Sequence, residues 1–417
     1  MAFALVLVAP SARAEDLHLG VASCASSLCH GATRPLGTHP IRQDEYFIWQ
    51  QQDRHSRAYH TLSNASSQKI GRALGIDPVS APACLACHAD PAATTARGPR
   101  YLLADGIGCE SCHGAAERWL PEHTRPGITA EQKVRLGMQP LWQAETRATL
   151  CLGCHQGDAA HPISHAMMAA GHPRLVFELD TFTALQPMHH QRDADYATRK
   201  GVYQPARDWL TGQASAAESH LQALTAGRFI SDGLMPEWMQ FDCTACHHSM
   251  DAGRWQAARM PGAEPGAVPF ADVPQQLLAV WLATVAPAEA LAWREGQQRL
   301  NASQAKGADA VRAAAQQQLT LLQSRVRPLI SAAPMTVSQL RALLRALVGD
   351  TSQAPLGSEQ RAMALTVIAD ALRLQGAPVS TAANRAIEAY YNTVRSVDRF
   401  DSKGHARALD AVARALP

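Results

Sequence analysis

The sequence predicts a mainly α-helical protein, in which a cysteine-rich segment with little regular sheet is followed by an α-helical bundle. Three observations support this fold class. No alternating run of apolar and polar residues is long enough for a large sheet. Helix-start signals recur along the chain, with glycine and proline at the joins. All cysteines precede residue 250, and the region beyond is rich in alanine.

Composition sets limits on the class of protein. The chain has 417 residues, 47% of them hydrophobic and only 6% aromatic, which suits two or three domains with a sizeable core. The formal net charge is +2, from 38 basic and 36 acidic side chains. This balance excludes a strongly basic nucleic-acid binder and an acidic disordered chain, so we expect no nucleic-acid partner.

The N-terminal residues 1–14 have the pattern of a Sec-type signal peptide. Residues 2–9 are apolar, Pro10 follows, and Ala12-Arg13-Ala14 has the small-x-small form of a cleavage site. A buried N-terminal segment is the alternative. No other apolar run reaches the length of a membrane span, since the one at 277–286 ends at Pro287. We therefore expect an exported, periplasmic protein without a transmembrane segment.

The ten cysteines form five close pairs, and a histidine directly follows each pair. The motifs are CASSLCH at 24–30, CLACH at 84–88, CESCH at 109–113, CLGCH at 151–155 and CTACH at 243–247. The cysteines are Cys24, Cys29, Cys84, Cys87, Cys109, Cys112, Cys151, Cys154, Cys243 and Cys246.

This spacing is typical of covalent haem attachment. Two thiols on one turn add to the two vinyl groups of a haem, and the next imidazole binds the iron. Disulfides that close loops of only a few residues would constrain the chain little. Structural zinc needs cysteine pairs that converge on one ion. The sequence thus predicts five covalently bound haem c groups. Their proximal iron ligands would be His30, His88, His113, His155 and His247.

Further motifs resemble those of a known family. CHGA recurs at 29–32 and 112–115, and WQQQDRHSRAYHTL occupies 49–62. Over about residues 20–250 the chain resembles the multihaem cytochromes c of the cytochrome c554 type. The type member is tetrahaem, whereas this chain has five motifs, a first motif of CX4CH form and a C-terminal helical extension. The hydroxylamine-oxidising partner of the type member is therefore not carried over.

Thirteen histidines remain for at most five distal iron positions. The resemblance implies a distal role for His55. Spacing favours His123, ten residues after a proximal histidine, and His165 and His172, seven residues apart and expected on one helical face. His189 follows shortly after them. Each of these has an ordinary hydrogen-bonded or surface histidine as its alternative.

Other candidate ligands are set aside. A ligand role for His60 is disfavoured because it does not share the helix face of His55. His18 and His405 lie outside the motif region, and His248 adjoins a proximal ligand and is expected to bind a propionate. Methionine would raise the reduction potential but is more often a core residue. The methionines concerned are Met167, Met168 and Met188.

The predicted organisation has four parts: the signal peptide 1–14, a pentahaem domain at 15–250, a Pro/Gly-rich linker at 251–274 and a helical domain at 275–417. Five macrocycles would fill much of the interior of the pentahaem domain, which explains the shortage of aromatic residues. Thr129 and Gln132 form a candidate capping box.

The C-terminal domain is predicted as a bundle of four to six helices. One helix begins at the capping box of Thr336 and Gln339 and ends at Gly349. Another extends from about Ser358 to Gln375. Their apolar faces carry Leu340, Leu343, Leu344 and Leu347 in the first, and Met363, Val367, Ile368 and Leu372 in the second.

The sequence favours an electron carrier that passes single electrons between redox partner proteins through mostly bis-histidine haems. The alternative is a multihaem oxidoreductase with one five-coordinate haem that acts on nitrite, hydroxylamine or a related nitrogen or sulfur species. No motif has the CxxCK form of pentahaem nitrite reductases. Ten haem propionates would make the folded protein acidic, so a basic patch is expected on its partner.

Overall fold

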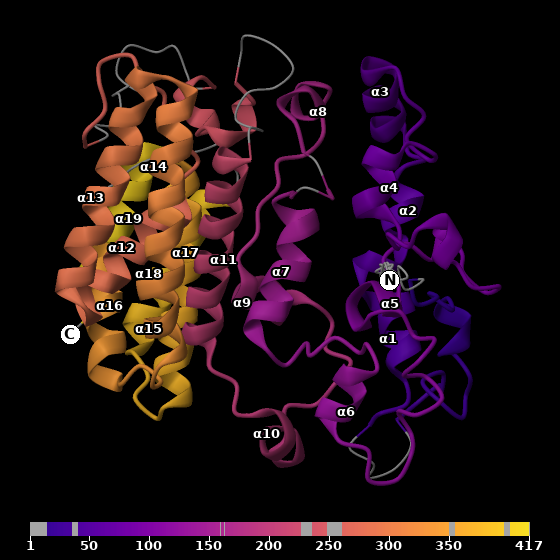
Figure 1. Cartoon of the computed structure of the whole chain (residues 1–417). Helices are drawn as coiled ribbons and strands as arrows, with labels where there is room; N and C mark the ends of the chain where they lie inside the picture. The colour runs from indigo at the N-terminus through magenta and orange to yellow at the C-terminus, as the bar shows by residue number, and fades with distance from the viewer. Residues whose placement is uncertain are drawn as a thin grey trace, which may run out of the picture. The chain divides into compact units, whose positions relative to one another are not determined.

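The computed structural model describes residues 15–35, 41–158, 160–161, 163–226, 236–247, 261–349, 355–395 and 401–416 (Figure 1). These residues are mainly helical, as predicted. Their only β-type pairings are two isolated bridges, His18 with Arg97 and Phe241 with Phe270. No helix in the described ranges is long and apolar enough to cross a membrane. The predicted signal peptide lies outside them.

The chain divides into two compact units, residues 15–64 with 79–141 and residues 65–78 with 142–416. The boundaries predicted at 250 and 275 stay predictions. The second unit includes residues before 250 because a long helix there, α11 (Pro205–Thr225), is buried in one apolar core with the C-terminal helices.

The first unit consists of short helices and turns. Its α-helices are α1 (Glu45–Gln52), α2 (Ala58–Thr61), α4 (Pro82–His88), α5 (Cys109–His113) and α6 (Ala130–Arg135). Its 3-10 turns are Val21–Ser23, Arg54–Arg57, Thr94–Ala96 and Leu103–Asp105. The capping box before α6 is confirmed, since Gln132 N donates to Thr129 Oγ1 at 3.2 Å and Thr129 N donates to Gln132 Oε1 at 2.8 Å.

Alanine dominates the buried apolar residues of this unit, and both apolar clusters of the described chain lie in the second unit. A unit of this length would normally bury leucine, isoleucine or phenylalanine in a core of its own. The first unit thus has the interior expected of a fold whose packing is completed by large apolar groups other than side chains.

In the second unit, α11 connects two sets of helices. On one side it contacts α7 (Ala144–His155) and α9 (Leu179–Leu185), and on the other side three helices of the bundle (Figure 1). These are α12 (Val273–Val285), α14 (Ala308–Leu321) and α17 (Pro355–Leu374). Gly212 allows this packing, because a Cβ there would lie 2.6 Å from Leu179 Cβ. The remaining elements before the bundle are α3 (Ala65–Leu74), α8 (His165–Ala169), α10 (Ala194–Lys200) and the 3-10 turns Trp238–Gln240 and Cys243–Ala245.

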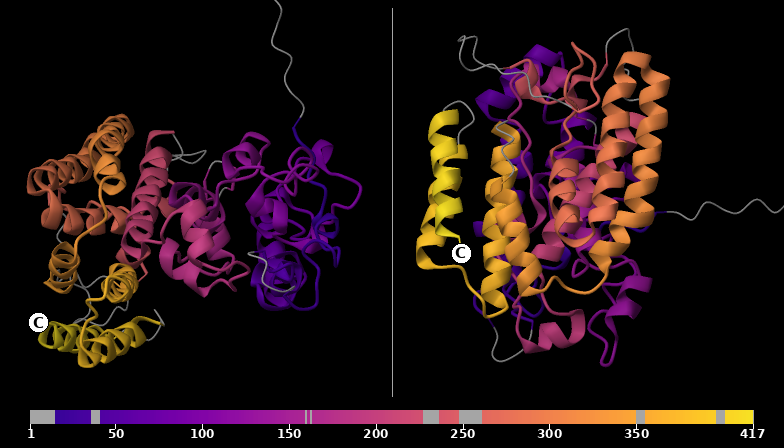
Figure 2. Two further views of the ribbon diagram at one scale, coloured as in Figure 1. Left: turned by 90° about the horizontal axis from the view of Figure 1, so that it is seen from below. Right: turned by 90° about the vertical axis from the view of Figure 1, so that its left-hand side faces the viewer.

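The C-terminal helices run beside one another as a bundle (Figure 2). They are α12 (Val273–Val285), α13 (Pro287–Ser303), α14 (Ala308–Leu321), α15 (Arg327–Ser331), α16 (Val337–Gly349), α17 (Pro355–Leu374), α18 (Thr381–Val394) and α19 (Ser402–Ala415). The described residues therefore hold more helices than the four to six predicted, because α14 passes into α15 through a π-helical turn at Leu322–Val326.

Both helices predicted in this region are present. At α16, Thr336 N donates to Gln339 Oε1 at 2.9 Å and the four leucines are buried. The inward residues of α17 are buried as predicted, and Gly376 follows with a φ of 72°. The helix α17 begins at Pro355 rather than near Ser358, because proline is favoured in the first turn, where a missing N–H costs nothing.

Candidate haem-attachment sites

Each cysteine pair occupies a single tight turn that ends at its histidine. The second motif forms the end of α4, the third coincides with α5, and the fourth forms the end of α7. The fifth begins with the 3-10 turn Cys243–Ala245. Side chains four residues apart share one face of a helix, so such a turn presents its first thiol and its histidine on the same side.

The first motif, with its longer spacing, folds into a closed loop. His30 N donates to Cys24 O at 3.2 Å and Gly31 N donates to Ser26 O at 2.9 Å. A Cβ on Gly31 would lie 1.9 Å from Ala25 O, so glycine is required for this closure. The loop brings the two cysteines and the histidine together despite the two extra residues.

None of the ten cysteines, all of which the structure describes, is in a disulfide. Within the described ranges, no three cysteine, histidine or acidic side chains converge as a metal-ion site. Each thiol pair is thus left without a disulfide, as covalent haem attachment requires.

Two proximal histidines have their Nδ1 atoms engaged. His30 Nδ1 lies 3.0 Å from Glu45 Oε2, and His88 Nδ1 lies 3.0 Å from Ala58 O. A carbonyl oxygen only accepts, so Nδ1 of His88 donates and the lone pair of its neutral ring is on Nε2. Metal-bound histidines typically make this second hydrogen bond. Glu45 also raises the pKa of His30 through its hydrogen bond.

The segment 49–62 joins the second and third motifs. Trp49 Nε1 donates to Ile107 O at 2.9 Å, and Ile107 N donates to His55 O at 3.0 Å. The carbonyl of Ala58 in the same segment accepts from His88. His55 is therefore beside the chain that enters the third motif, and its Nδ1 lies 2.9 Å from Asp53 Oδ1.

The rings of His30 and His123 face each other. Their centroids are 6.3 Å apart and their planes 23° apart. An iron between two imidazoles needs two bonds of about 2 Å, and each centroid is about 1 Å behind its nitrogen, which gives about 6 Å. His123 Nδ1 lies 2.6 Å from Leu120 O, so the lone pair of the neutral ring is on Nε2. The separation of the two rings is therefore compatible with the predicted distal role of His123.

The rings of His165 and His247 form a second such pair, with centroids 6.1 Å apart and planes 30° apart. His165 is the first residue of α8, and its backbone N donates to Glu237 Oε1 at 2.8 Å. Glu237 in turn caps the turn that precedes the fifth motif. Glu237 therefore joins the start of α8 to the segment just before the fifth motif.

His165 and His172 do not share a helical face, contrary to the prediction. The helix α8 ends at Ala169, and Gly171 with a φ of 108° turns the chain before His172. His172 Nδ1 lies 2.8 Å from Pro173 O. His189 lies edge-on to His190, with ring centroids 5.8 Å apart. Burial lowers the pKa of His190 to about 4.

The discounted histidines have other partners or lie outside the structure. His18 Nδ1 lies 2.8 Å from Asp90 Oδ1, and His405 in the bundle is hydrogen-bonded to Tyr390 and Thr393. His60 is exposed. His248 lies outside the described residues. Of the methionines, Met167 and Met168 are on α8 and Met188 is exposed.

Two features were not found from the sequence. The ring of His155 is flanked by Phe177 and Phe182, at centroid distances of 5.0 and 5.8 Å. The helix α9, which carries Phe182, contacts α7. No local signal marks these phenylalanines, because they come together with the fourth motif only through this packing.

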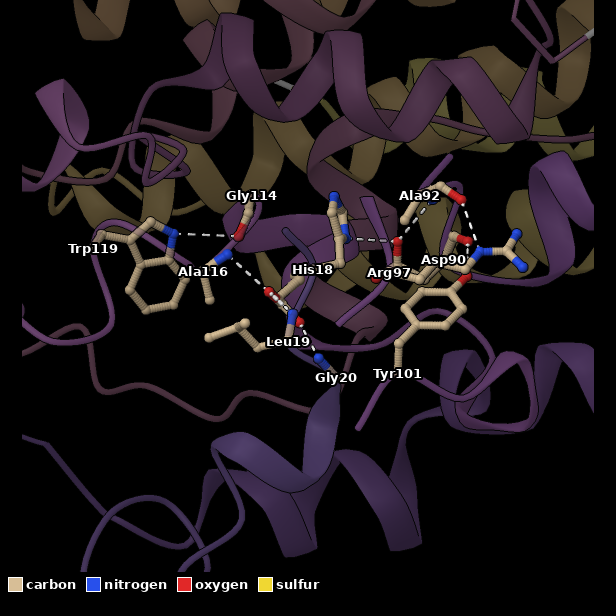
Figure 3. Close-up of polar contacts among 11 residues, drawn as sticks. His18, Leu19, Gly20, Asp90, Ala92, Arg97, Tyr101, Gly114, Ala116 and Trp119 are labelled. Carbon is tan, nitrogen blue, oxygen red and sulfur yellow. Dashed lines mark hydrogen bonds and ion pairs between the residues drawn. The ribbon is translucent and has the colours of Figure 1, made fainter. Parts of the chain in front are cut away.

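The second feature is Glu110, inside the third motif, whose backbone partners Leu19, Gly20 and Ala116 are labelled in Figure 3. Its side chain is buried and accepts from Leu19 N at 2.8 Å, Gly20 N at 2.7 Å and Ala116 N at 2.7 Å. It thereby ties the segment before the first motif to the third. The thiols of Cys24 and Cys109 are hydrogen-bonded to each other, so these two motifs are adjacent.

The paired thiols, the following histidines and the facing imidazoles are the features of a c-type cytochrome. Residues 23–114, with the first three motifs and the segment 49–62, match the family model described as cytochrome c554 and c-prime. This match supports covalently bound haem c and a part in electron transfer with redox partners. Neither a curated protein nor a solved structure matches the chain.

Proposed function

We propose that this protein is an exported pentahaem c-type cytochrome that passes single electrons between a donor and an acceptor protein. The observation that carries the proposal is the pair of facing imidazoles at two motifs, His30 with His123 and His165 with His247. Their separations suit a bis-histidine iron, a ligation that favours one-electron exchange at low potential over substrate binding.

The residues have distinct roles in this proposal. The ten cysteines hold the haems by thioether bonds, and the histidine after each pair is the proximal ligand. His123 is the distal ligand at the first motif and His165 at the fifth. The other three distal positions are assigned to His55, His172 and His189. Bound haem would supply an iron that alternates between the ferric and ferrous states.

The first and third motifs are suited to a direct electron step. Cys24 and Cys109 are hydrogen-bonded to each other, so the thioethers that replace these thiols would also be neighbours. Glu110 fixes this arrangement, because each of its three backbone bonds joins residues of the two motifs or their flanks. A short separation between haem edges is the main requirement for rapid transfer.

Export follows from the predicted signal peptide 1–14 and suits covalent attachment, since an exported protein then keeps its cofactors without relying on affinity. Donor and acceptor are expected to be redox proteins that present a basic patch toward the haem propionates. We assign the C-terminal bundle a scaffold role, because α11 buries one side against it and the other against α7, which carries the fourth motif.

The proposal is tested by haem content and spin state. A pyridine haemochrome assay and the mass of the mature chain should give five haems per polypeptide. EPR of the oxidised protein should show low-spin ferric signals. A large high-spin signal that shifts on addition of nitrite or hydroxylamine would instead support the oxidoreductase, and fewer than five haems would contradict the pentahaem assignment.

A further inference from the structure

Three carboxylates are buried close to the fourth motif in the second unit. Glu178, Asp180 and Asp208 are 1%, 5% and 8% exposed. Glu178 and Asp180 lie at the start of α9, and Asp208 lies in the first turn of α11, which packs against α9. Buried acidic side chains are rare unless they are paired or have a function.

Each carboxylate has defined partners. Glu178 caps α9, with Oε1 and Oε2 accepting from Asp180 N at 2.9 Å and Thr181 N at 2.8 Å. Asp208 accepts from the guanidinium of Arg147. Asp180 accepts from the hydroxyl of Tyr203. Asp180 thus has a neutral donor as its hydrogen-bond partner, whereas Asp208 has a cationic one.

The surrounding charges do not balance this cluster. Arg147 and Arg192 face it, and Arg192 stacks on the Tyr203 ring at 3.7 Å. Three carboxylates against these two guanidiniums leave one negative charge. Arg207 and Glu145 also act on Asp208, with opposite signs, so counting both leaves the same excess. The remaining contacts of the neighbouring groups are as follows. Arg207 donates to the carbonyls of Ser331 and Ala332, Glu359 of α17 pairs with Arg174, and Glu145 is exposed.

One bound proton would cancel this excess charge, and Asp180 is the group best placed to hold it. Burial, together with repulsion by the carboxylates Glu178 and Asp208, raises the pKa of Asp180 to about 7, although Tyr203 and Arg192 act to lower it. Burial also raises the pKa of Glu178 and of Asp208. Protonation of Asp180 relieves both the burial of its charge and the repulsion by its neighbours.

Two connections link the cluster to the fourth motif. Arg147, which pairs with Asp208, precedes Cys151 by one turn of α7, and its charge acts on that thiol. Phe177 and Phe182 flank the ring of His155, and Glu178 and Asp180 lie between them in the chain. An added charge at His155 would therefore act on the cluster across the contact between α7 and α9.

We propose that this carboxylate cluster is a redox-linked proton-binding site, at which Asp180 takes up one proton when the iron at the fourth motif gains one electron. The inference rests on the proposed function. The electron comes from the redox donor and converts ferric to ferrous iron, and the proton comes from water and converts the Asp180 carboxylate to the acid. The total charge of the region stays constant, which favours the coupled step in a buried environment.

The experiment is a spectroelectrochemical titration of the purified holoprotein between about pH 5 and pH 9, the range around the pKa of a raised carboxyl. For the wild type, the midpoint potential of one haem should fall with rising pH near neutrality, with a slope that approaches one proton per electron. Asp180→Asn should remove this slope and leave the other haems unchanged. The matched control is Asp195→Asn, an exposed residue of α10 paired with Arg199, which should keep the slope.

An infrared difference spectrum gives a second readout. Reduction of the wild type should produce a carboxylic-acid C=O band that shifts in D2O, and Asp180→Asn should lack it. Should this variant fail to fold, Tyr203→Phe removes only the donor to Asp180. Loss of that hydrogen bond should raise the pKa and move the sloped region to higher pH.

A slope that survives in Asp180→Asn, or a wild type without a slope at any haem, would overturn the inference. Failure of the proposed function looks different, because it would appear as fewer than five haems per chain or as high-spin iron at the fourth motif before any titration.

Discussion

The ring of His123 faces that of His30 at a centroid distance of 6.3 Å, although His123 follows the third attachment motif and His30 ends the first. The Nδ1 atom of His123 is hydrogen-bonded to Leu120 O, and the Nδ1 atom of His30 is hydrogen-bonded to Glu45. These two bonds hold the rings in place. The segment after one motif is thereby placed where it could complete the coordination proposed at another.

Replacement of His123 by alanine should open the sixth position at the first motif. We expect one high-spin ferric signal in EPR and binding of cyanide or carbon monoxide at one haem, because no other imidazole faces His30 in this way among the described pairs. His60→Ala, an exposed histidine of the same unit, is the control and should remain low-spin. Unchanged low-spin spectra in His123→Ala would contradict the assignment.

Replacement of Glu110 by alanine should destabilise the first unit. Two buried backbone N–H groups and one partly buried one lose their acceptor, and each unsatisfied donor costs about 1–3 kcal/mol, so we expect a loss of about 3 kcal/mol or more in the free energy of unfolding. Denaturant unfolding of the oxidised holoprotein measures it. Glu117→Ala is the control, since the exposed bond of Glu117 to Leu17 N should contribute less than about 1 kcal/mol.

Gly31→Ala should prevent haem attachment at the first motif. The new Cβ would lie 1.9 Å from Ala25 O, so the loop that brings Cys24, Cys29 and His30 together cannot close. The haemochrome assay should fall from five haems to four per chain. Gly349→Ala, where a Cβ meets nothing within 4 Å, should retain all five. Full haem content in both variants would show that the loop is formed differently.

Asp180 should make stability depend on pH. Its folded-state pKa, about 7, is above the unfolded value of 3.8, so the native state holds the proton more tightly. The contribution of Asp180 to the free energy of unfolding is then greatest below about pH 4. This contribution is lost as the pH rises through 7. Asp180→Asn should remove this loss and be more stable than the wild type at pH 8 by about 2–4 kcal/mol. Urea unfolding of both proteins at pH 5 and pH 8 tests this prediction. A stability difference between the variant and the wild type that is equal at the two pH values would refute it.

His220 should have the opposite pH dependence. It is buried on α11 with its Nε2 3.1 Å from Gln240 O, and burial lowers its pKa to about 4. The unfolded chain binds a proton near pH 6.5 while the native ring stays neutral, so stability should fall as pH decreases from 6.5 toward 4. His220→Gln should weaken this acid dependence. A urea midpoint that falls equally with acidification in both proteins would contradict it.

Local patterns determined the attachment motifs, because covalent haem binding needs cysteines and a histidine that are contiguous in the chain. The same holds for the capping boxes at Thr129 and Thr336, which depend on residues three positions apart. The apolar faces of α16 and α17 were also predictable, since helical periodicity follows from sequence spacing alone.

Local patterns failed where the chain direction changes or where distant segments meet. Spacing placed His165 and His172 on one face, but the turn at Gly171 separates them. The helix α11 was grouped with the haem segment, yet its apolar residues are shared with the C-terminal core. A seven-residue spacing between two histidines, or an apolar face on a helix, does not indicate which other segment of the chain these side chains will contact.

The sequence by itself thus predicts five haem-attachment motifs and determines which histidines follow the cysteines. Only the tertiary structure decided that His123 faces His30, that His165 faces His247, and that Asp180 is buried with Glu178 and Asp208 beside the fourth motif. These relationships join residues far apart in the chain. They result from the packing of whole helices and loops, which places side chains together irrespective of their separation in sequence.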